Sequence, residues 1–317
     1  MTKQSGLGDN CYVGGYNLSG DIGQIKTIGS PMKPIDTTGI DKSGHERIPG
    51  LRDGMFEFIA FYNPSSNQEH PVLSVLPTID VSVYYARGTT LGAPAACMIG
   101  KQIDYKPSRG SDGSFTFDVQ FQANGYGLEW GTQLTAGIRT DTAATNGASV
   151  DGGNGFATPA VAATTIPVTN TSPLPATVVI SAGTLTNVSV NGVTAGTGDG
   201  TYTVPAGGTI TLTYSVAPTW TWALQTSNGW QAYLQLFGFT GTDATVTLQD
   251  SADNSSWTNI ASGAFAQITA GRQTQRLAVG STAAVRRYVR AITSTSAGFS
   301  NLAFAVMLNK NQVATGF

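Results

Sequence analysis

Residues 114–122 alternate between polar and apolar side chains, and this pattern constrains the fold more than any other feature of the sequence. The apolar members are Phe115, Phe117, Val119 and Phe121. Because successive side chains of a strand point to opposite faces, the alternation predicts a strand with one face in a core and the other in solvent. Aromatic and β-branched runs at residues 55–62 and 79–86 predict two further strands.

The C-terminal part of the chain has the same character. Four runs predict strands there: residues 230–239, 244–250, 285–292 and 302–308. A helix is expected only at residues 70–76, where Pro71 suits the first helical position, and a turn is expected at residues 41–47. We therefore predict an all-β protein with a β-sandwich or barrel core.

Residues 153–225 differ from the sequence on both sides. Short Thr- and Val-rich runs are separated there by turn signals such as Asn191-Gly192, and Asp199 is the charged residue. Five or six short strands in such a length are typical of a small immunoglobulin-like β-sandwich. We predict three parts: a first part of the core at residues 1–152, an inserted module at 153–225, and a second part at 226–317 that completes or duplicates the core.

Charge is sparse and unevenly placed. Charged residues make up 11% of the chain, compared with roughly 25% in ordinary soluble domains. No Lys or Arg occurs between Arg139 and Arg272, whereas the sequence from Arg272 onward is basic and has no acid. Segregated charge of this kind favours oriented contact between copies of one chain. We expect a homo-oligomer.

The residues typical of catalysis or metal binding are few. His45 and His70 have no metal-ligand spacing, and no nucleophile elbow or phosphate-binding loop is found. Cys11 and Cys97 are expected to be buried free thiols. The segment from Asp250 to Asn254 could gather oxygens for Ca²⁺, but it suits a polar turn better. We predict neither an enzyme nor a cofactor.

Two small groups are candidates for contacts. Arg286, Arg287 and Arg290 are candidate intersubunit residues, with Arg287 facing the opposite side of its strand from the other two. Specific nucleic-acid binding is a weaker interpretation, because the net charge is −2 and no nucleic-acid motif accompanies the arginines. Trp220 and Trp222 are candidate adhesion aromatics for a glycan, although tryptophans at strand ends more often seal a domain edge.

Several motifs resemble those of major tail, or tail tube, proteins of long-tailed actinobacterial phages. They are GLGDN at 6–10, YVGGYNLSGD at 12–21, GIDK at 39–42, GLRDG at 50–54, YARGTTLG at 85–92, NGYGLEWG at 124–131, TLQDSAD at 247–253 and RRYVR at 286–290. The resemblance covers both flanks, and residues 153–225 resemble an added immunoglobulin-like module. The motifs themselves carry no chemistry.

The resemblance implies a tail-tube-like core built from both flanks and a structural role in the virion. Rings of six copies, or of three if each chain carries two tube domains, would stack into a tube through which DNA passes without specific binding. Other virion proteins would be partners, membranes would not, and assembly would take place in the host cytoplasm. A capsid decoration or spike protein, and a glycan-binding adhesion module, are the alternatives.

Overall fold

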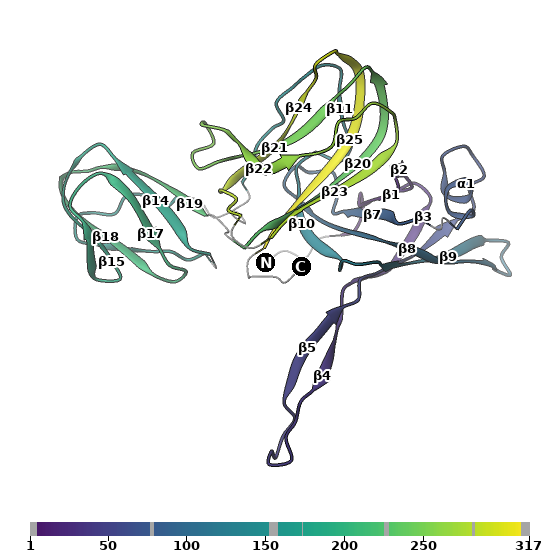
Figure 1. Ribbon diagram of the computed structural model, residues 1–317, viewed down its shortest axis with the longest axis horizontal. Coiled ribbons are helices and arrows are strands. Elements are labelled where there is room, and N and C mark those ends of the chain that lie inside the picture. Colours follow the sequence, from purple (N-terminus) through teal and green to yellow (C-terminus); the bar gives the residue numbers. More distant parts are fainter. Residues whose placement is uncertain are drawn as a thin grey trace.

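The computed structural model describes residues 5–76, 79–151, 158–172, 174–224, 228–280 and 283–311. Over these ranges the chain is built from strands and one five-residue helix, α1 (Glu69–Leu73) (Figure 1). The all-β prediction is confirmed. The predicted helix at residues 70–76 is present but begins one residue earlier and ends at Leu73.

The N-terminal flank, residues 5–151, forms a curved sheet around its own core. Its strands are β1 (Asn10–Val13), β2 (Tyr16–Asn17), β3 (Ile22–Gly29), β6 (Met55–Phe61), β7 (Val81–Ala86), β8 (Pro94–Arg109), β9 (Phe115–Ala123) and β10 (Glu129–Gln133). The first half of β8 pairs with β7 and β10, and its second half pairs with β9. One long strand therefore joins two parts of the sheet, whose core holds Phe56, Phe58 and Phe121.

The C-terminal flank, residues 228–311, extends the same sheet. β20 (Trp230–Gly241), β23 (Gln273–Val279) and β25 (Phe299–Lys310) continue it, and β11 (Arg139–Asp141) of the N-terminal flank also pairs with β25. The junction is the pairing of β10 with β25. A second sheet of β12 (Val150–Asp151), β24 (Tyr288–Ser294), β21 (Thr245–Ser251) and β22 (Thr258–Ala264) completes this part of the fold. A separate core with Trp230, Leu248 and Phe304 fills it.

The module, residues 158–224, has two sheets and a core of its own. Its strands are β13 (Pro167–Thr169), β14 (Ala176–Ser181), β15 (Thr184–Val190), β16 (Val193–Gly196), β17 (Gly200–Val204), β18 (Thr209–Val216) and β19 (Thr219–Leu224). In the pairings described, these strands join only one another, and Figure 1 shows them to one side of the flanks. The ends of the predicted insert, at 152–157 and 225–227, lie outside the described residues.

The turn between β15 and β16 follows from its two residues. Asn191 and Gly192 have φ angles of 51° and 79° and connect the paired residues Val190 and Val193. Positive φ at both central positions is the requirement of a type I′ hairpin turn, which Asn-Gly meets with little strain. The predicted hairpin at this position is confirmed.

The arm, residues 32–52, is a two-stranded ribbon that projects from the N-terminal flank (Figure 1). β4 (Met32–Asp36) and β5 (Arg47–Arg52) pair only with each other. The sequence indicated a turn at 41–47, which lies between these strands, but no strands beside it. The strands were not predicted because they contain Pro34, Pro49 and Gly50, and proline and glycine are normally depleted from strands.

Candidate self-assembly surface

The arm exposes five large apolar side chains. The exposed fractions are 52% for Met32, 50% for Ile35, 109% for Ile40, 50% for Ile48 and 92% for Leu51. Ile35 and Ile48 are directly opposite each other in the ribbon and so share one face. Neighbouring apolar groups exposed in this way are typical of a surface that contacts another molecule. An isolated two-stranded hairpin is at best marginally stable in water, which gives the same indication.

Short-range polar contacts hold the tip of the arm in shape. His45 Nδ1 lies 2.9 Å from Asp36 Oδ2, and Lys42 Nζ lies 3.4 Å from Glu46 Oε1. Hydrogen bonds from Thr38, and a smaller contribution from His45, hold the pKa of the Asp36 carboxyl below its usual range. His45 therefore pairs with Asp36 and serves the loop.

The base of the arm is attached to the body at several points. Asp53 N donates to Pro31 O at 2.9 Å, which closes the ribbon. Gln122 Nε2 donates to the Asp53 carboxylate at 2.9 Å, and Leu128 N donates to Ser30 Oγ at 3.3 Å. The arm thus leaves the flank from a fixed base.

A second set of exposed apolar side chains comes from the segments that flank α1 in the sequence and from the start of β9. Phe61, Tyr62 and Phe115 are 53%, 43% and 39% exposed, and Val75 and Leu76 are 69% and 47% exposed. The rings of Tyr62 and Phe115 lie 5.3 Å apart, so these two rings are neighbours. We name these five residues the α1 patch. In Figure 1, α1 lies above the sheet of the N-terminal flank and the arm extends below it.

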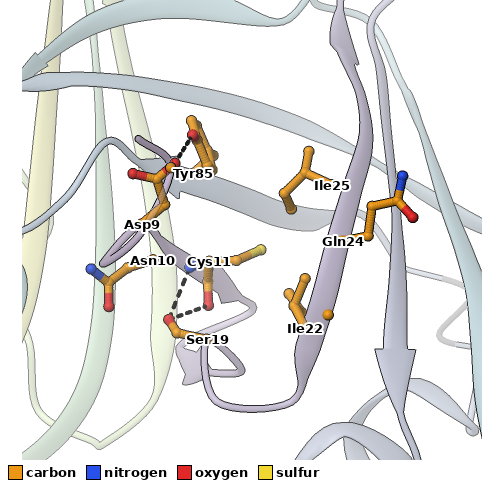
Figure 2. A pocket seen from close by; sticks show the side chains of 10 residues that line it. Asp9, Asn10, Cys11, Ser19, Ile22, Gln24, Ile25 and Tyr85 are labelled. Carbon is orange, nitrogen blue, oxygen red and sulfur yellow. Dashed lines mark hydrogen bonds between the residues drawn. The ribbon is translucent and has the colours of Figure 1, made fainter. Parts of the chain in front are cut away.

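A groove lies between β1 and β3, where the N-terminal sheet is open (Figure 2). Its cavity volume is about 260 Å³, and Cys11, Ser19, Ile22, Ile25 and Tyr85 are among its lining residues. Cys11 N donates to Ser19 Oγ at 2.9 Å, so the backbone of β1 is already satisfied at this point. Burial raises the pKa of the Cys11 thiol far above its usual value, which keeps the thiol neutral.

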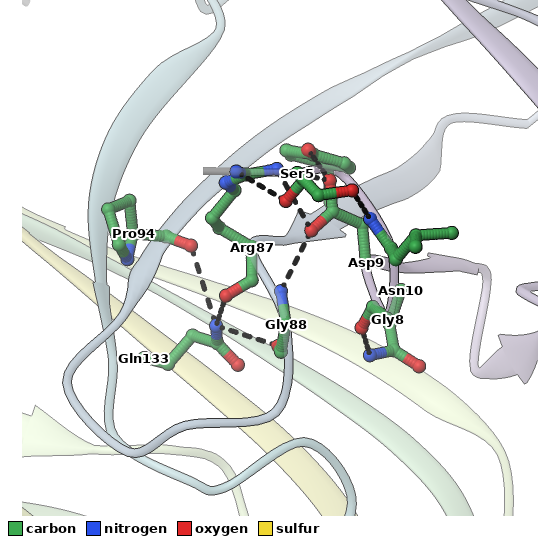
Figure 3. A network of polar contacts seen from close by, with 10 residues as sticks. Ser5, Gly8, Asp9, Asn10, Arg87, Gly88, Pro94 and Gln133 are labelled. Carbon is green, nitrogen blue, oxygen red and sulfur yellow. Dashed lines mark hydrogen bonds and ion pairs between the residues drawn. The ribbon is translucent and has the colours of Figure 1, made fainter. Parts of the chain in front are cut away.

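The network around Asp9 beside this groove serves the fold (Figure 3). The Asp9 carboxylate accepts hydrogen bonds from Tyr85 Oη, from Arg87 Nη1 at 2.9 Å and from Gly88 N at 3.1 Å. Arg87 also donates to Ser5 O at 2.7 Å. These bonds fasten the N-terminal segment to the end of β7, and every oxygen of the carboxylate has a partner within the chain.

The three predicted arginines all have partners in their own chain. Arg287 is 2% exposed, and its guanidinium pairs with Asp151 at 2.6 Å and donates to Trp222 O at 3.1 Å. Arg290 donates twice to Gln249 Oε1 and stacks over Trp257 at 4.2 Å. The predicted alternation is present, with Arg287 on the buried side. Arg287 serves the junction between the module and the C-terminal flank, and it has almost no surface for another subunit.

Arg286 has 43% of its side chain exposed. Its guanidinium donates to Thr258 Oγ1 at 3.1 Å, and its backbone N donates to Asp250 Oδ2 at 2.8 Å. An intersubunit role stays a prediction for Arg286 and Arg290.

The two predicted adhesion aromatics belong to the structure of the module. Trp222 is 0% exposed and lies in the module core, so its ring offers no face to a sugar. Trp220 packs edge-to-face against Trp222 at 5.4 Å, and its Nε1 donates to Pro159 O at 2.8 Å. Both rings thus pack within the module, and an adhesion role stays a prediction for Trp220, which is partly exposed.

The acidic segment from Asp250 to Asn254 is a polar turn. Asp253 accepts hydrogen bonds from Ser255 N and Ser256 N, and these donors hold the pKa of its carboxyl well below the usual range. Within the described ranges, no group of three or more His, Cys, Asp or Glu residues could hold a metal ion. In the same ranges, no helix has the length and hydropathy needed to cross a membrane.

Comparison with known proteins adds weak likenesses. No family model and no curated protein matches the chain. The Dit protein of phage SPP1, described as a hub of the adsorption apparatus in phages that infect Gram-positive bacteria, aligns at 10% identity and a TM-score of 0.28 over 96% of this chain and 99% of that one. Two structures of the activated phage p2 baseplate, with Sr and with Ca, align at 12% and 11% identity and TM-scores of 0.30 and 0.29 over the same shares of each chain. Scores this low carry no argument about fold or function.

Proposed function

We propose that this protein is a structural subunit that assembles with copies of itself, and that the arm is the element that joins them. The observation that carries the proposal is the set of five exposed apolar side chains on a ribbon with no core. Burial of these side chains against a partner would be favourable by roughly 25 cal/mol for each Å² of apolar surface removed from water.

The partner that suits the arm best is a second copy of this chain. The arm and the α1 patch both expose apolar side chains, and in Figure 1 the arm extends below the sheet of the N-terminal flank while α1 lies above it. A contact between two different surfaces of identical subunits is heterologous, so it leaves one arm and one patch free for the next copies. The expected product is a stack of subunits and not a closed dimer.

The resemblance of the motifs to tail tube proteins supplies the setting for this assembly. We propose that the subunits form rings of six, or of three with two tube domains each, and that the arm joins successive rings of a phage tail tube. The virion would then be the location, other virion proteins would be partners, and DNA would pass through the tube without specific binding. The module would project from the tube.

Electron microscopy in negative stain, with sedimentation velocity, tests the proposal. The purified chain should form rings or tubes with a central hole. A variant with Ile35, Ile40, Ile48 and Leu51 changed to Ser should be folded but form no tubes, and it should sediment as single rings or single subunits. A control with Ile166, Val193 and Val216 changed to Ser removes exposed apolar groups from the module instead, and it should assemble normally.

Two results would contradict the proposal. A native chain that stays monomeric at every concentration and salt would exclude self-assembly. Normal tubes from the four-residue arm variant would mean that the arm does not join the copies.

A further inference from the structure

Two arginines near the start of β23 reach across from the C-terminal flank to the N-terminal flank. Arg272 stacks over Tyr16 at 4.7 Å, and Arg276 stacks over Tyr126 at 3.7 Å. The two contacts are of the same chemical type, since each places a guanidinium on a tyrosine ring. They differ in the contacts made by the segment that carries the tyrosine.

Arg276 belongs to a buried charged group. Its side chain is 8% exposed, its Nε lies 3.1 Å from Tyr233 Oη, and its Nη2 lies 3.5 Å from Glu129 Oε1. Tyr233 Oη also donates to Glu129 Oε2 at 2.7 Å. Burial raises the pKa of the Glu129 carboxyl, while Tyr233, Arg276 and Arg52 act in the opposite direction.

The segment that Arg276 contacts is the one that carries the base of the arm. Leu128 N donates to Ser30 Oγ, two residues before β4. Arg52, the last residue of β5, lies 3.9 Å from Glu129 Oε1. Its guanidinium also packs so closely on Gly127 that a Cβ there would lie 3.1 Å from it. Residues 127–129 therefore contact the arm at both of its ends.

Tyr126, the tyrosine that Arg276 contacts, is not buried in a core. Tyr126 is 47% exposed and lies in a non-strand segment that contains Gly125 with φ at 82°. The guanidinium of Arg276 lies over its ring, 3.7 Å from the centroid, and so links this segment to the C-terminal flank. Lys has the same charge but lacks the planar group that stacks on a ring and spans two acceptors.

We propose that Arg276 is a positioning residue that fixes the direction of the arm relative to the C-terminal flank, through its contacts with Tyr126 and Glu129. The role of the arm in assembly rests on the proposed function, but the direction of the arm does not. An experiment can therefore refute either claim without the other.

Pulsed electron–electron distance measurement tests this in the full chain, in the fraction that elutes as a single subunit. Spin labels are placed at Lys42→Cys on the arm and Ser294→Cys on β24; Cys11 and Cys97 are buried and do not compete. With Arg276 present, the distance distribution should be narrow. Arg276→Met and Arg276→Lys should each widen it about two-fold or more, because the segment under the arm gains local freedom.

Arg272→Met is the matched control, because it removes a stacked arginine between the same flanks away from the arm, and its distribution should stay narrow. Tyr126→Ala breaks the stack without removing a charge, and it should widen the distribution even if Arg276→Met does not fold. An unchanged width in Tyr126→Ala and Arg276→Lys would overturn the proposal, as would equal widening by Arg272→Met. A narrow native distribution in a chain that never assembles would refute only the proposed function.

Discussion

The arm and the module both extend from the two flanks, but they are built in opposite ways. The module encloses its own core, in which Val178, Ile210 and Trp222 are buried. Every residue of the arm is described and none is buried. A domain with a core can fold without help, whereas a ribbon with exposed apolar groups needs a partner. The difference is the basis for our proposals that the module is an addition to the subunit and that the arm takes part in assembly.

Removal of the module is the strongest test of the difference between the module and the arm. Replacement of residues 153–227 by a short flexible linker should leave flanks that fold and assemble, because the described strands of the module pair only with one another. The measurement is thermal unfolding together with negative-stain microscopy. Flanks that fail to fold would show that the module is integral to their core.

Trp222→Ala should unfold the module alone. Replacing a fully buried tryptophan by alanine costs about 3–5 kcal/mol, and Trp222 lies in a core that the flanks do not share. Calorimetry should show one transition at lower temperature and another unchanged. A single shifted transition for the whole chain would contradict the independence of the module.

Arg287→Met should loosen the attachment of the module with a smaller loss of stability. The change removes the ion pair of Arg287 with the partly exposed Asp151 and its hydrogen bond to Trp222 O, at a cost of about 1–3 kcal/mol. Small-angle X-ray scattering should show a larger radius of gyration. Arg286→Met is the control, because Arg286 is more exposed and does not contact the module, and it should leave the radius of gyration unchanged.

The smallest expected effect is a pH dependence of stability that arises within the C-terminal flank. Hydrogen bonds, first from Ser296 N, lower the pKa of the Asp243 carboxyl from 3.8 to about 2. A carboxyl with a lowered folded-state pKa stabilises the fold above its unfolded-state pKa and loses that effect as pH falls through the folded value. Asp243→Asn should therefore lower the melting temperature at pH 7, and the difference should vanish near pH 2. A difference that does not depend on pH would contradict this explanation.

The sequence was sufficient for the features that depend on local pattern. Alternation from Phe115 to Phe121 predicted β9, and Asn191-Gly192 predicted a hairpin turn, because both rules act between near neighbours. The arm was not predicted, since Pro34 and Pro49 are unfavourable in ordinary strands and are tolerated here where both edges of the ribbon are open.

The contacts of charged and aromatic residues could not be predicted in the same way. Arg287 pairs with Asp151, which is 136 positions away in the chain. Arg276 pairs with Glu129, which lies on the other flank of the shared sheet. Nothing in the neighbouring sequence marks either pair. Trp222 illustrates the same limit, because its ring lies inside the module and its carbonyl oxygen serves Arg287 outside it.

The burial of the arm in the assembled form is the most direct test of the central claim. Ile40→Cys on the arm and Val193→Cys on the module both introduce a thiol at an exposed position. In the single subunit, a maleimide should label both thiols at similar rates. After assembly, the thiol at position 40 should become protected and the thiol at position 193 should still react. Equal labelling of both positions in the assembled protein would contradict the account.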